Sequence, residues 1–157
     1  MLRFSRNRVV AFDLDDALAF EGETGPYLQY AVVRAKNILR KLAERRGPDE
    51  ADAGWLAERA DLAALPAETL ADHWEIPLLL SRLEGVLDQA VGSLELAVLA
   101  KHAYVLAQAF NSFYHRFPVA QEEDPAVRRV RAAVVRLFHD GMTHLLDLMG
   151  IEVPGRM

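Results

Sequence analysis

Two tyrosines and an arginine recur at a spacing that brings their side chains onto one side of a helix. Tyr27, Tyr30 and Arg34 follow one another at intervals of three and four residues, which places them on one arc of an α-helix. Asn37 and Lys41 continue that arc. Two aromatic rings with a guanidinium and an amide between them can stack on an unpaired nucleobase and hydrogen-bond to it. The alternative is that the tyrosines are half-buried rim residues and the cations a solvated face.

Local signals predict the helix that carries this arc. Thr24 or Gly25 can serve as the N-cap, and Pro26 suits the first turn, where its missing N–H costs nothing. The helix is expected to run to about Arg46, because a Gly-Pro pair follows. Residues 1–23 are expected to form an extended lead-in.

The rest of the sequence predicts further helices joined by short links. They are expected over residues 51–64, 66–72 (a single turn), 75–91 (starting around Pro77), 94–116 (capped by Ser93) and 125–149. Asp124 before Pro125 is the clearest start signal, and Gly150 is the matching stop. Four long amphipathic helices and one or two short ones predict an all-α helical bundle. The lead-in is expected to hold at most one short strand, at residues 9–12.

Charge is distributed unevenly along the 157 residues, whose net charge is −5. Residues 34–46 hold six cations and one anion, whereas residues 47–100 hold eleven anions and two arginines. This pattern fits a small, local contact with nucleic acid, and it fits the ordinary charged surface of a helical bundle equally well.

Several classes of chemistry are not expected. The chain has no cysteine, so disulfides and zinc–thiolate sites are excluded. His139 and His144 are five residues apart, which points them in different directions on a helix, and no metal site is predicted. No serine has a plausible histidine and aspartate signature around it, and no catalytic residue is predicted. No uninterrupted apolar run is long enough to span a membrane, so a cytoplasmic location is the default expectation.

Four segments carry a resemblance to a known family. GETGPYLQYA at residues 22–31, followed by Arg34, resembles the opening of the C-terminal helical domain of arginyl-tRNA synthetases, the DALR anticodon-binding domain. LAQAFNSFYH at residues 106–115 resembles the third long helix of that domain, and MGIEVPGRM at residues 149–157 is similar to its terminal tail. FDLD and ALAF, between residues 12 and 20, look like its entry segment. The matches occur in the right order over nearly the whole chain.

The resemblance implies a function and a division of the chain. Residues 24–157 would be the anticodon-recognition domain of an arginine–tRNA ligase, and residues 1–23 the linker from its catalytic domain. The expected partners are tRNA(Arg) and that catalytic domain, with no membrane. The sequence holds neither HIGH-like nor KMSK-like signatures. ATP, arginine and magnesium would therefore bind the missing catalytic domain, and no cofactor is expected in this chain.

The resemblance also implies candidate contacts for an anticodon base, which would be the central C. The candidates are Tyr27, Tyr30, Arg34, Asn111, Tyr114 and Met157. Asn111 could instead make a structural hydrogen bond, and Met157 reaches the site only if the tail folds back rather than frays. Phosphate contacts are expected from Lys41, Arg128, Arg129 and Arg131.

Two other functions stay open at this stage. The chain can be read as a freestanding accessory protein that binds tRNA through a DALR-type domain, or as a helical protein-interaction module. The segment 48–72 is longer and more acidic than the resemblance leads us to expect, and Val32-Val33 stand where a more polar pair is usual. These departures concern loop contacts and fine specificity rather than the fold.

Overall fold

The structure is a computed structural model that describes residues 13–18 and 22–157. Within these residues it is built from helices without strands. The α-helices are α1 (Leu14–Leu18), α2 (Gly25–Arg46), α3 (Ala53–Arg59), α4 (Leu70–Ser81), α5 (Leu83–Ser93), α6 (Leu96–Arg116) and α7 (Pro125–Leu148). Three 3-10 turns complete the set: η1 (Pro48–Ala51), η2 (Leu62–Ala64) and η3 (Ala67–Thr69). The predicted all-α bundle is therefore confirmed.

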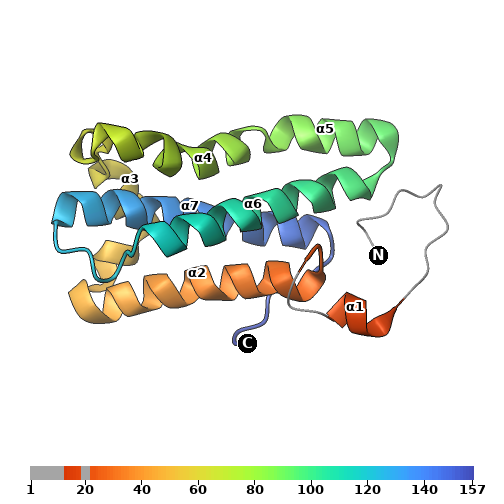
Figure 1. Cartoon of the computed structure of the whole chain (residues 1–157), viewed down its shortest axis with the longest axis horizontal. Coiled ribbons are helices and arrows are strands. Elements are labelled where there is room, and N and C mark those ends of the chain that lie inside the picture. Colours follow the sequence, from red (N-terminus) through yellow and green to blue (C-terminus); the bar gives the residue numbers. More distant parts are fainter. Residues whose placement is uncertain (1–12, 19–21) are drawn as a thin grey trace.

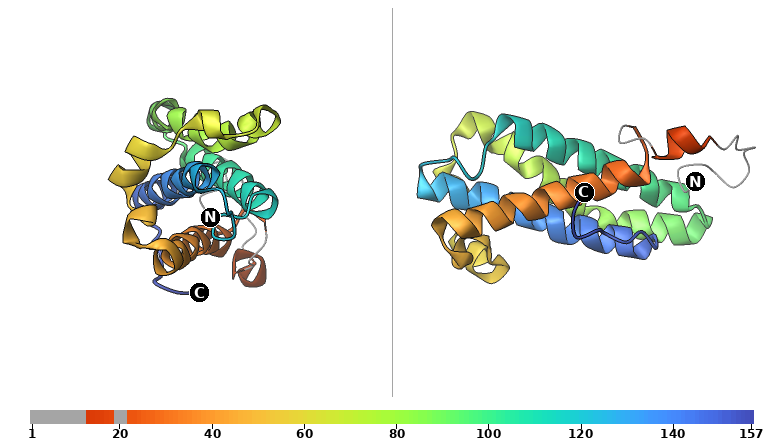
Figure 2. Two further views of the ribbon diagram at one scale, coloured as in Figure 1. Left: turned by 90° about the vertical axis from the view of Figure 1, so that its left-hand side faces the viewer. Right: turned by 90° about the horizontal axis from the view of Figure 1, so that it is seen from below.

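The bundle is arranged around α7. This helix packs against α2, α3, α4 and α6, while α5 packs mainly on α6 (Figure 1). Figure 2 shows in end-on view that α2, α7 and α6 lie side by side, with α4 and α5 beyond them. At the centre, the rings of Phe110 and Phe138 stack with centroids 3.9 Å apart, and both side chains are fully buried. This core fixes the distance between α6 and α7.

The ends of the two longest helices follow the predicted capping signals. The Thr24 side chain accepts a hydrogen bond from the Tyr27 backbone N–H at the start of α2. The Asp124 carboxylate accepts from the first backbone N–H groups of α7. Gly150, with a φ of 69°, follows that helix in the left-handed conformation that glycine adopts without strain. Both helices are therefore positioned by local sequence as well as by packing.

Three predicted elements differ from the structure. Residues 14–18 form α1 instead of an extended lead-in, and the possible strand at residues 9–12 lies outside the described residues. The segment 51–64 is divided into α3 and flanking 3-10 turns. The helix predicted over residues 75–91 is two helices, α4 and α5, separated at Arg82.

Burial explains why α4 begins earlier than its proline suggests. Pro77 lies inside α4, and His73 and Ile76 on the turn before it are each 1% exposed. Packing of these two side chains offsets the hydrogen bond that the proline cannot donate. Ser93 was predicted to cap the following helix, but it ends α5 and its hydroxyl donates to the Gln89 carbonyl.

The C-terminal tail folds back toward α2. Ile151 and Val153 pack against the core, and the Gln29 side-chain amide donates to the Glu152 carbonyl over 2.7 Å. Figure 2 shows the end of the chain beside α2. No helix in the described part of the chain is long and apolar enough to cross a membrane.

Candidate functional site

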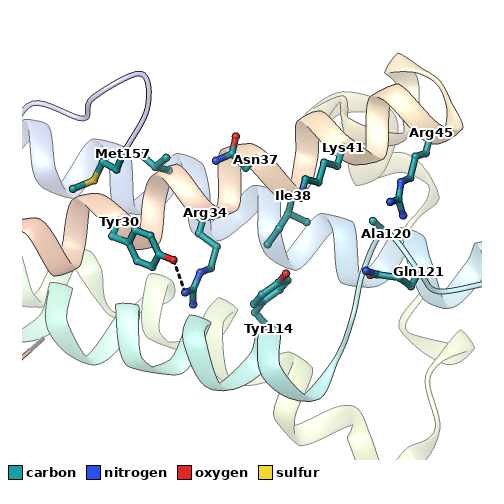
Figure 3. Close-up of a pocket in the computed structure, with 11 residues that line it drawn as sticks. Tyr30, Arg34, Asn37, Ile38, Lys41, Arg45, Tyr114, Ala120, Gln121 and Met157 are labelled. Atoms are coloured by element: carbon teal, nitrogen blue, oxygen red, sulfur yellow. Dashed lines mark hydrogen bonds between the residues drawn. The ribbon is translucent and has the colours of Figure 1, made fainter. Parts of the chain in front are cut away.

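A surface pocket of about 280 Å³ lies along α2, between this helix, the end of α6 and the link to α7. This volume is close to the lower end of the range of about 300–1,000 Å³ that is usual for ligand pockets. The residues that line it are Tyr30, Val33, Arg34, Asn37, Ile38, Lys41 and Arg45 of α2, Tyr114 of α6, Ala120 and Gln121 of the link, and Met157 of the tail (Figure 3). Three parts of the chain that are distant in sequence, α2, residues 114–121 and the tail, therefore meet here.

Tyr30, Arg34 and Tyr114 form what we name the stacking end of the pocket. The Arg34 guanidinium carbon lies 4.6 Å from the ring centre of Tyr30 and 5.6 Å from that of Tyr114. The guanidinium also donates to the Tyr30 hydroxyl over 3.0 Å. Tyr30 is 39% exposed, so its ring remains open to a ligand. Two aromatic faces and a planar cation are thus available on one wall of the pocket.

Asn111 holds the guanidinium in place from the neighbouring helix. Its side-chain oxygen accepts from Arg34 over 2.8 Å, and its amide nitrogen donates to the Tyr27 hydroxyl over 2.9 Å. Of the five N–H donors of an arginine, two are used by Asn111 and Tyr30, and three remain for a ligand. The predicted alternative for Asn111, a structural hydrogen bond, is therefore present in the structure.

Tyr27 supports the pocket rather than lining it. Its ring packs against Tyr104 of α6, with centroids 5.5 Å apart, and its hydroxyl is engaged by Asn111. It does not appear among the lining residues, although it shares a helix arc with Tyr30 and Arg34. The reason is that α2 faces the middle of α6 at this turn and faces the open pocket only further along.

The pocket is electropositive. Its lining includes Arg34, Lys41 and Arg45, and it includes no acidic residue. Within the described part of the chain, Lys41 and Arg45 are exposed and take part in none of the hydrogen bonds or ion pairs. Such cations are available to an anionic ligand such as a phosphate.

Arg128 is not available for the phosphate contact expected of it. The residue is 6% exposed, and its Nε lies 3.2 Å from a carboxylate oxygen of Glu50. Its terminal nitrogen donates to the backbone carbonyls of Glu122 and Glu123. The guanidinium is therefore committed to holding the protein together, and this part of the prediction does not fit the structure.

Arg131 and Arg129 also lie away from the pocket. Arg131 donates to the Glu122 carboxylate over 2.6 Å and to the Pro118 carbonyl over 3.0 Å. Arg129 lies over the Trp55 ring at 5.2 Å and is half-buried. Of the four predicted phosphate contacts, only Lys41 lines the pocket.

Sequence reasoning missed Arg45 and Gln121 as lining residues. Arg45 belongs to the cationic stretch of α2, so its charge was visible, but its direction was not. Gln121 lies in a polar link whose conformation depends on arginines later in the chain. The spacing of Asn37 puts it on the same helix arc as Tyr30 and Arg34, and this residue does line the pocket. Among the described residues, no group of three or more metal-ligating side chains is found.

Comparison with known proteins identifies relatives that match nearly the whole chain. An arginine–tRNA ligase of Maricaulis maris is 38% identical over 149 residues, which cover 93% of this chain and 22% of that protein. An arginine–tRNA ligase of Clostridium acetobutylicum is 34% identical over 156 residues, which cover 99% of this chain and 25% of that protein. The chain thus spans about a quarter of the length of these relatives.

A solved structure and a family match agree with these relatives. The Thermus thermophilus arginyl-tRNA synthetase superposes with a TM-score of 0.80 at 28% identity, covering 99% of this chain and 25% of that chain. Residues 28–157, which include every residue of the pocket, match the family described as DALR anticodon binding domain. The chain therefore belongs to the DALR anticodon binding domain family.

Proposed function

We propose that this chain is the part of an arginine–tRNA ligase that recognises the anticodon of tRNA(Arg). The observation that carries the proposal is the pocket on α2, in which aromatic rings and cations meet without an acidic residue. The similarity to arginine–tRNA ligases over nearly the whole chain supports the choice of tRNA over other RNAs.

Recognition would begin when one base turns out of the base stack of the anticodon loop and enters the stacking end. Stacking on an aromatic ring contributes about 1–3 kcal/mol per base, and a cation–π contact about 0.5–2 kcal/mol. A cytosine presents two acceptors, N3 and O2, to which the free N–H groups of Arg34 would donate. Its exocyclic amine would donate to the side-chain oxygen of Asn37, which is exposed and has no partner among the described residues. Met157 would cover the site from the tail.

The contribution of this chain to aminoacylation would be one of position. Binding the anticodon would hold the acceptor end of the tRNA in register for an active site. That active site would lie in another part of a full-length ligase. We propose that ATP, arginine and magnesium bind in that other part.

Binding of an anticodon hairpin of tRNA(Arg), measured by fluorescence anisotropy, tests the proposal. Arg34→Ala is expected to weaken binding about tenfold or more, because it removes the planar cation between two rings. Arg40→Ala is the matched control, since Arg40 is exposed on the same helix but does not line the pocket. Equal binding of wild type, Arg34→Ala and Arg40→Ala would show that the pocket does not recognise the RNA.

A change of the central C supplies the second half of this test. The wild-type chain is expected to bind the hairpin with a substituted central base more weakly, and Arg34→Ala is expected to reduce that difference. If the wild-type chain binds both hairpins equally, it does not read the base.

A further inference from the structure

The pocket extends along α2 beyond the stacking end. Arg34 and Arg45, which both line it, are eleven residues apart on α2, or about 16 Å along the helix axis. Beyond the stacking end, the pocket is lined by Lys41, Arg45 and Gln121, which we name the loop end (Figure 3). The loop end has no aromatic ring of its own, and its chemistry is that of two cations and an amide.

The side chains of the loop end are available to a ligand. Lys41, Arg45 and Gln121 are all exposed, and none takes part in a hydrogen bond or ion pair within the residues that the structure describes. In Figure 3, Arg45 reaches from α2 toward the link, where Gln121 lies with its amide turned toward Tyr114. The amide therefore faces along the pocket toward the stacking end.

The link that carries Gln121 is held by two arginines of α7. Arg131 donates to the Pro118 carbonyl and to the Glu122 carboxylate, and Arg128 donates to the Glu122 carbonyl over 3.1 Å. These contacts fix the chain on both sides of Gln121. The ion pair with Arg131 also neutralises the only carboxylate next to it.

We infer that the loop end is a second nucleotide subsite. Gln121 reads the edge of the base next to the one at the stacking end, and Lys41 and Arg45 hold the phosphate between the two. An amide offers a donor and an acceptor side by side, which suits a base edge, whereas cations on phosphate give position without sequence information. Arg128 and Arg131 are positioning residues for Gln121. The inference rests on the proposed function and extends it from one base to two neighbouring bases.

Base preference at each loop position tests the role of Gln121. Affinities are measured for a panel of anticodon hairpins in which every base is placed in turn at the central position and at its two neighbours. Gln121→Ala is expected to reduce the ratio between the best and worst base about 3- to 10-fold at one neighbouring position. The preference at the central position should remain. Gln89→Ala on α5 is the control, because that exposed glutamine is remote from the pocket.

Salt dependence tests the phosphate contact. The slope of the logarithm of affinity against the logarithm of salt concentration changes by about 0.7 for each contact with a single-strand phosphate. Arg45→Ala is expected to reduce the slope by about this amount. Arg46→Ala removes the same charge from a residue outside the pocket and should reduce the slope less.

The outcomes separate the two proposals. If Arg34→Ala weakens binding but Gln121→Ala leaves every base preference unchanged, the second subsite is wrong and the anticodon pocket stands. An affinity loss with Gln121→Ala that is equal for all hairpins also overturns it, because no base is then being read. If the wild-type chain binds none of the hairpins, both proposals fail.

Discussion

Arg34 is the residue that connects the fold to the pocket. It donates to Asn111 of α6 and to Tyr30 of its own helix while it lies over the Tyr114 ring. Its geometry is therefore set before any ligand arrives, which lowers the conformational entropy that is lost on binding. The planar shape of the guanidinium is what allows these contacts to be made together.

Replacement of this arginine by lysine separates shape from charge. Arg34→Lys keeps the charge but loses the two-sided hydrogen bonding and the stacked plane. We expect hairpin affinity to fall about tenfold, with helix content by circular dichroism unchanged. A lysine variant that binds like wild type would mean that the pocket supplies charge alone.

Tyr114 provides a test of stacking that is independent of charge. Its hydroxyl takes part in none of the described hydrogen bonds, whereas its ring lies beside Arg34. Tyr114→Phe is therefore expected to bind the hairpin within about twofold of wild type, and Tyr114→Ala about 5- to 100-fold more weakly. Equal losses in the two variants would contradict stacking and would assign the effect to the hydroxyl.

At the scale of elements, a buried histidine of α4 packs against aromatic rings at the end of α6. His73 is 1% exposed, and its ring lies 5.3 Å from that of Phe113 and 4.4 Å from that of Phe117. Burial holds the pKa of His73 below its ordinary value of 6.5, and the nearby Arg131 acts in the same direction. His73 therefore resists protonation in the folded chain, whereas the unfolded chain takes up that proton near pH 6.5.

The free energy of unfolding is consequently expected to fall as pH decreases below about 6.5. Each such histidine contributes at most about 1.4 kcal/mol per pH unit, and burial lowers the pKa of His102 in the same direction. Urea denaturation at pH 7.5 and 5.5 measures the loss. His73→Phe should reduce the difference between the two pH values, and the matched His115→Phe, at an exposed position, should not. Stability that is equal at both pH values would contradict this account.

The same elements show what sequence could and could not predict. The bounds of α2 and α7 follow from Thr24, Asp124 and Gly150, whose effects are local. The start of α4 does not, because burial of His73 and Ile76 before Pro77 outweighs the local preference of the proline. Local signals decide helix ends only where packing does not compete with them.

For the pocket, spacing along one helix was enough to group Tyr30 and Arg34. Tyr114, which comes from α6, was indicated only by the family resemblance. The role of Arg128 could not be predicted, because its partner Glu50 lies 78 residues away in the sequence. Pairings between distant segments are set by the fold, and composition alone does not reveal them.

At the scale of the whole molecule, ion pairs of Glu50 connect the segment after α2 with α7. Its side chain is 12% exposed and pairs with Arg128, which is 7% exposed, and it lies 3.8 Å from Arg129. Removing one partner of a buried pair leaves the other charge without compensation. Glu50→Ala is therefore expected to lower the free energy of unfolding by about 3 kcal/mol, as measured by urea denaturation.

An exposed ion pair supplies the control for this prediction. Glu58 and Arg59 are paired in solvent, so Glu58→Ala should change stability by less than about 1 kcal/mol. Similar effects of the two substitutions would show that burial of Glu50 does not matter.

The central claim is that the pocket on α2 receives a base that has turned out of the base stack of the anticodon loop. A crystal structure of the chain bound to an anticodon hairpin of tRNA(Arg) tests it most directly. The expected result is a base at the stacking end, in contact with Tyr30 and Tyr114, with its edge hydrogen-bonded to Arg34. A hairpin bound on another face, with all loop bases away from these three side chains, would contradict the claim.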